Sequence, residues 1–466
     1  MKCLLVSPPW TFEDTHSEML QEGVAGVTPP SGLLYVAAVL REAGHEVSVI
    51  DGAFASHRMM LAEIKKRNPD FLGISIVSML WAHGKRLADA AKRQNQGMFI
   101  AAGGPHPTTL PYEAMKECKG VDAIICGEGE LTIKDLVGAL ESKKSLDTVK
   151  GIIYQKGKSV KATKPRPLLK DLDTLPYPAF DLIDIRKYRP SVGHYKKLPY
   201  IGVVMSRGCP MNCLYCYKLT GSTIRERNPV KVVDEIEHYV KTYGIKEVKF
   251  WTEWFTYRKQ TVMAFCDELI KRKLNIVWSC TARVDNLDEE MLRKMKEAGC
   301  WYLQFGIESG VQKNLNTLRK GTTLKQIERA VALTHKVGLK SFCSYILGIP
   351  GETFEEAKQT IEFACKLNSF YAEFFPLTPF PGTDLYTDVH KYGKMVGSMS
   401  ELTMHHIPFV PHSMTREQLA YLQKYAFRRY YSRPGFILMR LASIRSFEDV
   451  KIGWWGFKAL LSVMRG

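Results

Sequence analysis

The sequence predicts an α/β protein in which a flavodoxin-like doubly wound sheet precedes a partial (β/α)6 barrel and a helical C-terminal segment. Two observations predict this fold class. Short apolar runs alternate with segments of helical periodicity over most of the first 385 residues, which is the pattern of parallel sheets covered by helices. A stretch rich in Lys, Pro and turn residues interrupts the alternation once. We therefore expect four parts, at residues 1–140, 141–199 (a linker), 200–385 and 386–466.

Composition sets outer limits on function. The chain has 466 residues and a formal charge of +17, from 65 Lys and Arg against 48 acidic residues. This excess suits an anionic substrate, nucleic acid or a membrane surface, or it is simply a solvated basic face. No apolar stretch approaches the roughly 20 residues of a transmembrane helix, and the N-terminus is too soon broken by proline for a signal peptide. We therefore expect a cytoplasmic protein whose 11 cysteines are reduced.

The first 140 residues contain five predicted strands with helices between them. The strands are "KCLLVSPP" (2–9), "HEVSVIDG" (45–52), "FLGISIV" (71–77), "MFIAAGGPHPT" (98–108) and "VDAIICGEGE" (121–130). Ligands of doubly wound sheets bind beyond the carboxyl ends of the strands. Two strand ends are rich in glycine, which lets the backbone approach a bulky ligand. The candidate ligand-binding residues there are Gly103, Gly104, His106, Gly127, Glu128 and Gly129.

Each of these candidates has a plainer interpretation. A glycine pair at a strand end can be only a tight turn, and His106 can be an ordinary loop histidine. In the linker, "GIIYQKGKSVKAT" (151–163) predicts a small hairpin. The stretch "LDTLPYPAFDLI" (172–183) is too apolar for a disordered tether, so we expect it to pack between the two domains.

The densest chemical signal is "SRGCPMNCLYCYK" (206–218), in which Cys209, Cys213 and Cys216 follow an apolar strand. A zinc site usually needs a second pair of ligands, which is missing nearby, and a thioredoxin-type site needs two cysteines rather than three. Three thiolates on a short loop can hold three irons of a [4Fe–4S] cube and leave the fourth iron open. An open iron can chelate S-adenosylmethionine (SAM) and cleave it to a 5′-deoxyadenosyl radical.

Strand and helix signals continue to alternate after the cysteines. The six predicted strands are "YIGVVMS" (200–206), "VKFW" (248–251), "IVWSCTARV" (276–284), "WYLQFGIES" (301–309), "KSFCSYILGIPGE" (340–352) and "SFYAEFFPLTPFPGT" (369–383). Helical segments lie between them, so the pattern predicts a partial barrel. The cysteine loop then lies at the carboxyl end of the first strand, where barrel enzymes carry their chemistry.

These stretches together resemble a known enzyme family. "SPPW", "TPPSGLLYVAAVLREAGHEVSVID", "GGPHPT" and "VDAIICGEGE" resemble the cobalamin-binding domain that precedes a radical SAM domain, and residues 200–385 resemble that second domain. The resemblance implies a [4Fe–4S] cluster, SAM and cobalamin as cofactors, and an electron donor such as flavodoxin or ferredoxin. The sequence lacks the Asp-x-His-x-x-Gly motif, since "DTHSEM" has Met19 where glycine is needed. Cobalamin would therefore be held without a histidine on cobalt; a purely structural domain is the alternative.

The resemblance also implies roles for single residues. Tyr215, the aromatic residue before the third cysteine, would pack under adenine. Glu253 would bind the SAM amine, although Thr252 stands where an aspartate is common, and a rim glutamate is the alternative. Arg283 suits the SAM carboxylate because its guanidinium fork matches a carboxylate, whereas a salt bridge to Asp285 is the plainer interpretation.

Two further motif positions follow the later strands. Glu308 and Ser309 would reach the ribose or the amino-acid part of SAM. Gly348, in "LGIPGE", would let the backbone flank adenine, although a turn is needed there anyway.

The C-terminal segment predicts two or three basic amphipathic helices. They could contact a membrane peripherally, cover a hydrophobic substrate or form a cap packed on the barrel. The resemblance implies C-methylation of an unactivated carbon in a small-molecule, tetrapyrrole or lipid-like substrate. The alternative is a radical cyclase or rearrangement enzyme that resembles the anaerobic magnesium-protoporphyrin monomethyl ester cyclase. We expect no nucleic acid partner, because no RNA-binding motif accompanies the basic charge.

Overall fold

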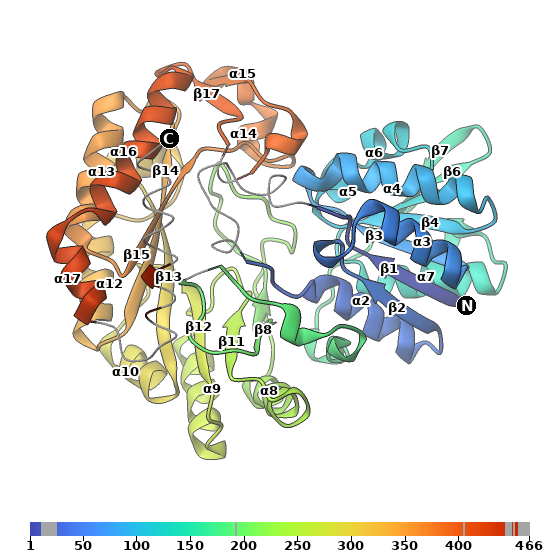
Figure 1. Cartoon of the computed structure of the whole chain (residues 1–466), viewed down its shortest axis with the longest axis horizontal. Helices are drawn as coiled ribbons and strands as arrows, with labels where there is room; N and C mark the ends of the chain where they lie inside the picture. The colour runs from blue at the N-terminus through green and yellow to red at the C-terminus, as the bar shows by residue number, and fades with distance from the viewer. Residues whose placement is uncertain (11–25, 192, 404–405, 443–449, 451–452, 455–466) are drawn as a thin grey trace.

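The computed structural model describes residues 1–10, 26–191, 193–403, 406–442, 450 and 453–454. Two α/β units lie side by side, and the C-terminal helices pack against the second unit (Figure 1). The incomplete "DTHSEM" motif at 14–19 lies outside the described residues.

The N-terminal unit is a seven-stranded sheet in the order β2-β1-β3-β4-β5-β6-β7. Its first five strands are parallel: β1 (Lys2–Val6), β2 (Glu46–Ile50), β3 (Phe71–Ser75), β4 (Phe99–Gly103) and β5 (Ala123–Ile125). The order 2-1-3-4-5 is that of flavodoxin-like folds, so the predicted fold class is confirmed. The expected hairpin forms as β6 (Ile152–Lys156) and β7 (Ser159–Ala162), and it extends this sheet through an antiparallel pairing of β5 with β6.

Helices cover both faces of this sheet. One face packs against α2 (Ser31–Glu42) and α7 (Glu130–Glu141). The other face packs against α3 (His57–Arg67), α4 (Trp81–Gln94) and α6 (Pro111–Glu117), with the short α5 (Pro105–Thr109) between β4 and α6. Each face has its own apolar core, because side chains alternate along a strand between the two faces.

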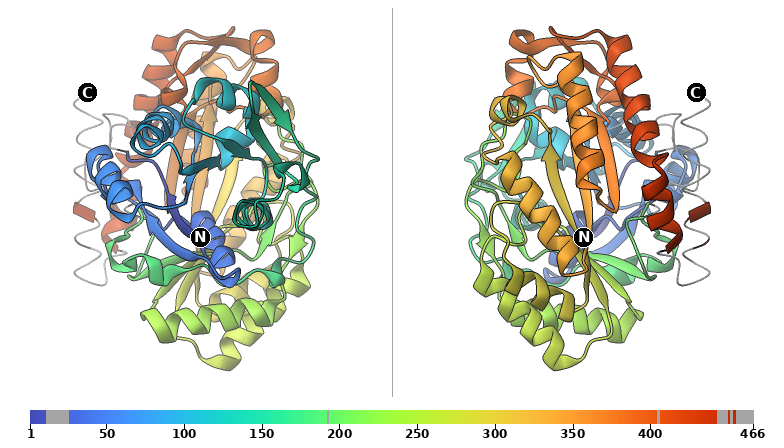
Figure 2. Two further views of the ribbon diagram at one scale, coloured as in Figure 1. Left: turned by 90° about the vertical axis from the view of Figure 1, so that its right-hand side faces the viewer. Right: turned by 90° about the vertical axis from the view of Figure 1, so that its left-hand side faces the viewer.

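The second unit is a six-stranded parallel sheet in the order β15-β14-β13-β12-β11-β8. Its strands are β8 (Tyr200–Val203), β11 (Glu247–Phe250), β12 (Val277–Ala282), β13 (Cys300–Glu308), β14 (Lys340–Leu347) and β15 (Tyr371–Pro376). Its helices include α8 (Pro229–Tyr243), α9 (Lys259–Arg272), α10 (Glu289–Glu297), α11 (Gln312–Thr317), α12 (Leu324–Lys336) and α13 (Phe354–Leu367). Because neighbouring strands follow chain order, this is the predicted partial (β/α)6 barrel. The right panel of Figure 2 shows its later helices (yellow to orange) across the outer face of the sheet.

The segment between the units packs between them, as expected. Ala179 belongs to the core of the N-terminal sheet, whereas the next residue, Phe180, belongs to the barrel core. Leu34, on α2, also joins the barrel core. The left panel of Figure 2 shows the N-terminal unit (blue to teal) in front of the barrel.

After the barrel, the chain forms α14 (Asp384–Thr387), α15 (Val389–Tyr392), the β16–β17 hairpin (Gly393–Met395 and Phe409–Pro411), α16 (Arg416–Tyr431) and α17 (Pro434–Ala442). Helix α16 caps the barrel: the hydroxyls of Tyr430 and Tyr431 donate to the carbonyls of Ser369, just before β15 (2.5 Å), and of Ala372, within β15 (2.7 Å). The cap interpretation is therefore confirmed for this helix. None of the helices in the described ranges has the length and apolar character to cross a bilayer.

Candidate functional site

The three motif cysteines lie in a loop that two short strands close at its base. Strand β9 (Ser206–Arg207) enters the loop, and β10 (Arg225–Glu226) leaves it, antiparallel to β9. We call residues 208–224 the cysteine loop. Gly208 has a φ of +100°, and a Cβ there would lie 2.2 Å from the Thr223 carbonyl oxygen, so only glycine fits. The Cys209 amide donates to the Gly221 carbonyl at 3.1 Å, which holds the loop in its folded shape.

The thiols of the loop influence one another. Burial raises the pKa of Cys216 to about 11, and the neighbouring thiols of Cys213 and Cys209 raise it further in the same direction. Burial also raises the pKa of Cys213, against the lowering effect of the Lys320 ammonium. A metal centre that binds Cys213 and Cys216 would therefore have to displace their thiol protons.

The donor set fits an iron–sulfur cluster better than a single ion. Within the described part of the chain, no three His, Cys, Asp or Glu side chains are arranged to hold one metal ion. A structural zinc ion needs its ligands around one point, whereas each cysteine of a [4Fe–4S] cube binds a different iron. Three cysteines on one loop match the second case.

Tyr215 of this loop forms a buried polar cluster with Glu308 and Lys320. Oε1 of Glu308 accepts hydrogen bonds from the Tyr215 hydroxyl at 2.8 Å and from Lys320 Nζ at 2.7 Å. Glu308 ends β13 with a φ of +68°, a conformation that is uncommon for glutamate and that concentrates at functional sites. The structure thus brings together two predicted SAM-binding residues, and it adds Lys320, which the sequence analysis missed.

Arg283 lies next to this cluster, but its guanidinium is bound by Asp285, two residues further along the chain. Its guanidinium donates to both carboxylate oxygens of Asp285, at 3.1 and 2.7 Å, and to the Lys320 carbonyl at 3.1 Å. It also lies over the Trp254 ring at 5.0 Å. The salt bridge considered as the plainer interpretation is therefore present, and the role at the SAM carboxylate stays a prediction.

The stretch after β11 contacts the cysteine loop at one point and the residues that lead into the loop at another. Glu253 is exposed and accepts a hydrogen bond from the Thr220 hydroxyl of the loop at 2.5 Å. Thr252, in the position where an aspartate is common, is buried, and its Oγ1 accepts from the Met205 amide at 3.1 Å. Thr252 therefore holds the backbone that leads into the loop. The role of Glu253 at the SAM amine stays a prediction.

Ser309 and Gly348 have structural partners in the barrel wall. Ser309 is fully buried, and its hydroxyl lies 3.0 Å from that of Thr360 on α13. Gly348 has a φ of +84°, and a Cβ there would lie 2.9 Å from Leu419 of α16. Its amide donates to Glu352 at 2.7 Å. These contacts account for both residues by packing, so their predicted contacts with SAM find no direct support here.

The glycine-rich strand ends of the N-terminal unit differ in how much space surrounds their backbone. Gly104 has a φ of +93°, and a Cβ there would lie 2.9 Å from the Ile76 backbone, which accounts for it as a tight turn. Gly103 ends β4 with only ordinary contacts to Ile125. At Gly127, with a φ of +79°, a Cβ would meet nothing within 4 Å, so a ligand can approach this backbone closely. Gly129 follows at the start of α7.

His106 and Glu128 are occupied within the protein. The His106 ring is buried 4.6 Å from the Trp81 ring, and this burial lowers the pKa of His106 to about 4. It is therefore a neutral histidine in the domain interior. The carboxylate of Glu128 binds Arg207 and Arg225 of the other unit. Direct contacts of these side chains with cobalamin stay predictions.

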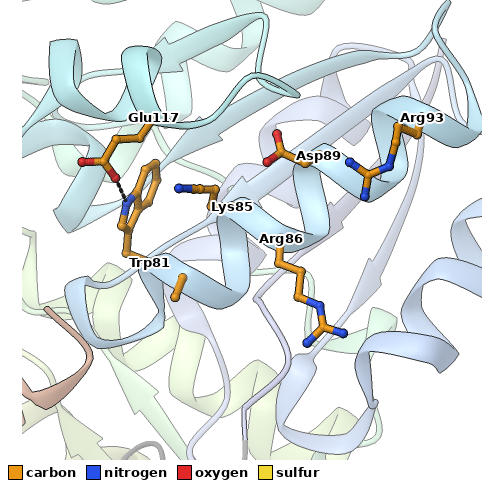
Figure 3. A pocket seen from close by; sticks show the side chains of 7 residues that line it. Trp81, Lys85, Arg86, Asp89, Arg93 and Glu117 are labelled. Atoms are coloured by element: carbon orange, nitrogen blue, oxygen red, sulfur yellow. Dashed lines mark hydrogen bonds between the residues drawn. The ribbon is translucent and has the colours of Figure 1, made fainter. Parts of the chain in front are cut away.

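A surface cavity of about 350 Å³ lies elsewhere on the N-terminal unit (Figure 3). It is lined by residues of α4 and by Glu117 of α6, whose carboxylate accepts from the Trp81 indole nitrogen at 2.7 Å. The cavity lies on helices rather than at the carboxyl ends of the strands, and its lining contains none of the predicted site residues.

The sequence analysis also missed Lys249. Its strand neighbours Val248 and Phe250 pack in the core under the helices, so Lys249 points to the opposite, concave face of the sheet. Its Nζ donates to Gln304 Oε1 at 2.9 Å, and burial lowers the pKa of Lys249 to about 8. The sequence did contain a signal for Lys249, since it is a charged residue in the middle of the predicted strand "VKFW".

Two family models match the chain. The model described as "Radical SAM superfamily" matches residues 203–364, and the one described as "B12 binding domain" matches residues 21–137. A relative from Pyrococcus horikoshii, named "Uncharacterized methyltransferase PH0819", is 35% identical over 445 residues, which cover 94% of each chain. The chain belongs to the family of radical SAM enzymes with an N-terminal cobalamin-binding domain. Family membership implies a [4Fe–4S] cluster, SAM and cobalamin as its cofactors.

A further relative and two solved structures also resemble most of the chain. The anaerobic magnesium-protoporphyrin IX monomethyl ester cyclase of Rubrivivax gelatinosus is 28% identical over 471 residues, covering 93% of this chain and 83% of that protein. Among solved structures, OxsB, a cobalamin-dependent SAM radical enzyme, superposes with a TM-score of 0.76 at 17% identity, over all of this chain and 72% of that one. The methyltransferase TsrM from Kitasatospora setae gives 0.70 at 18% identity, over 93% and 89% of the two chains. These likenesses support the fold described above.

Proposed function

We propose that the enzyme methylates an unactivated carbon of a small-molecule substrate. The observation that carries this proposal is the contact of Arg207 and Arg225, which flank the cysteine loop, with Glu128 in the loop that follows β5; it links the predicted cluster site to the predicted cobalamin site. A radical centre and a methyl donor must both reach one substrate carbon, and this contact supports their lying across one interface.

The chain's own residues have defined parts in this proposal. Cys209, Cys213 and Cys216 would hold the cluster, and the open backbone at Gly127 would admit cobalamin. With SAM bound as well, these groups would supply a deoxyadenosyl radical and a transferable methyl group. Glu308 and Lys320 neutralise each other beside the thiols, which keeps this region buried without an unpaired charge. A donor such as flavodoxin or ferredoxin would reduce the cluster.

Lys249 supports a substrate that carries a polar or anionic group. Its ammonium is buried on the concave face, with the Gln304 amide oxygen at 2.9 Å and the Trp251 ring at 4.9 Å. The carboxylates of Glu373 and Glu247 offset only part of this burial, because the pKa of Lys249 is still lowered, and a buried ammonium is costly without a close anionic partner. A carboxylate, as on a tetrapyrrole, suits this site better than a purely hydrocarbon lipid does.

Cyclisation is the second candidate, because the cyclase of Rubrivivax gelatinosus aligns with 93% of this chain. SAM labelled in its methyl group separates the two. The anaerobic, reconstituted enzyme should give labelled product, whereas Cys213→Ala should hold no iron and give no labelled product. Deoxyadenosine formation with a substrate that gains no label would favour cyclisation instead.

A further inference from the structure

Glu128 is the centre of an ion-pair cluster between the two units. Its Oε1 accepts from Arg207 at 3.1 Å and from Arg225 at 2.9 Å, and its Oε2 accepts from Arg225 at 3.0 Å and from the Leu169 amide at 2.9 Å. Arg207 is the last residue before the cysteine loop, and Arg225 is the first residue after it. One carboxylate of the N-terminal unit therefore holds both ends of the loop.

A second acidic residue reinforces the same contact. Glu130 accepts from the other terminal nitrogen of Arg207 at 2.6 Å. Arg225 also donates to the Thr220 carbonyl inside the loop, at 2.7 Å. The four side chains are between 9% and 12% exposed, so solvent screens these ion pairs little. Two-point pairing of a guanidinium with a carboxylate also fixes orientation.

The backbone of Glu128 belongs to the other predicted cofactor site. It lies between Gly127, whose open backbone can accept a close ligand, and Gly129, at which α7 begins. Any ligand that fixes this backbone also fixes the carboxylate, and through it the ends of the cysteine loop.

We propose that Glu128 is a positioning residue that couples the cobalamin and cluster sites, so that occupation of one raises the affinity of the other. The coupling is reciprocal, because both ligands favour the same arrangement of the Glu128–Arg207–Arg225 contact. This inference rests on the proposed placement of cobalamin beside Gly127.

Cobalamin affinity with and without the cluster tests the coupling. Hydroxocobalamin is titrated anaerobically into the full chain before and after reconstitution of the cluster. In the wild type, reconstitution of the cluster should tighten cobalamin binding by at least about 5-fold. In Glu128→Gln, reconstitution should leave the cobalamin affinity unchanged. The ratio of the cobalamin affinity with the cluster to that without it measures the coupling. Glu130→Gln, which weakens only the Arg207 contact, should give a smaller ratio than the wild type. Glu63→Gln removes an exposed ion pair with Arg67 on α3 and should keep the full ratio.

A spectroscopic readout separates positioning from general stability. The EPR signal of the reduced cluster should change when cobalamin binds to the wild type and stay unchanged in Glu128→Gln. If that variant does not fold, Arg225→Lys, which keeps the charge and loses the two-point contact, should reduce the ratio. Equal cobalamin affinities in the wild type with and without cluster, or a full ratio in Glu128→Gln or Arg225→Lys, would overturn the coupling. A wild type that binds neither cofactor would overturn the proposed function as well.

Discussion

Replacing Glu352 by glutamine should stabilise the protein, increasingly so as the pH rises. Glu352 is fully buried, and its Oε2 accepts from the amides of Gly348 at 2.7 Å and Ile349 at 3.2 Å. Burial raises the pKa of this carboxyl from 4.5 to about 8. Asn314 donates to Oε1, and Oδ1 of Asn314 has no hydrogen-bond partner within the described ranges. After rotation of the Asn314 amide, a glutamine side chain can donate to that oxygen.

The size of the effect follows from the two pKa values. Between pH 4.5 and about 8 the folded state holds a proton that the unfolded state has released, so wild-type stability falls as the pH rises through this window. Glutamine carries no such proton. At about 1.4 kcal/mol per pKa unit, Glu352→Gln gains about 1.5 kcal/mol at pH 5.5 and about 3 kcal/mol at pH 7.

Urea denaturation followed by circular dichroism, at pH 5.5 and pH 7, measures both values. Glu356→Gln is the matched control on the same segment, because the ion pair with Lys313 lowers the pKa of Glu356 and its loss should not stabilise the chain. A stability difference between Glu352→Gln and the wild type that stays constant with pH, or shrinks as the pH rises, would refute the reasoning.

Three shorter predictions concern the barrel. Cys213→Ala should remove the brown chromophore and SAM cleavage; iron analysis and deoxyadenosine assays check this, and retained cleavage would contradict the cluster assignment. Glu308→Gln should cost about 3 kcal/mol, because it leaves the buried Lys320 ammonium unpaired; denaturant midpoints measure the loss, and a neutral variant would count against the ion pair. Lys249→Met should gain about 2 kcal/mol at pH 7, since burial lowers the pKa of Lys249 to about 8 and the lost bond to Gln304 offsets part of the gain. That gain should shrink as the pH rises from about 8 through 10.5 and vanish above that, where the lysine is neutral in both states; a gain that persists there would exclude this cause.

Much of the site was predictable because its signals are local. The spacing of Cys209, Cys213 and Cys216, and the glycine that precedes them, lies within a few residues of chain. Glu308 was predictable for a similar reason, since it is a charged residue at the end of an apolar strand. Its partner Lys320 was not, because a lysine in a loop gives no local sign of which carboxylate it will meet.

Other features depended on how distant strands assemble. The hairpin at 151–163 was predicted, but only the pairing of β6 with β5 shows that it extends the N-terminal sheet. His106 was considered as a ligand-binding residue, and only the packing of α4 over β4 encloses it against Trp81.

By itself, the sequence determined the order of strands and helices, the two parallel sheets and the loop that carries the three cysteines. Each of these depends on periodicity or spacing over a few to about 15 residues, which the chain shows directly. Only the tertiary structure decided that Glu128 meets Arg207 and Arg225, 79 and 97 residues away along the chain. Such pairs are set by how two folded units dock, and the free energy of docking is spread over many contacts that no local pattern records.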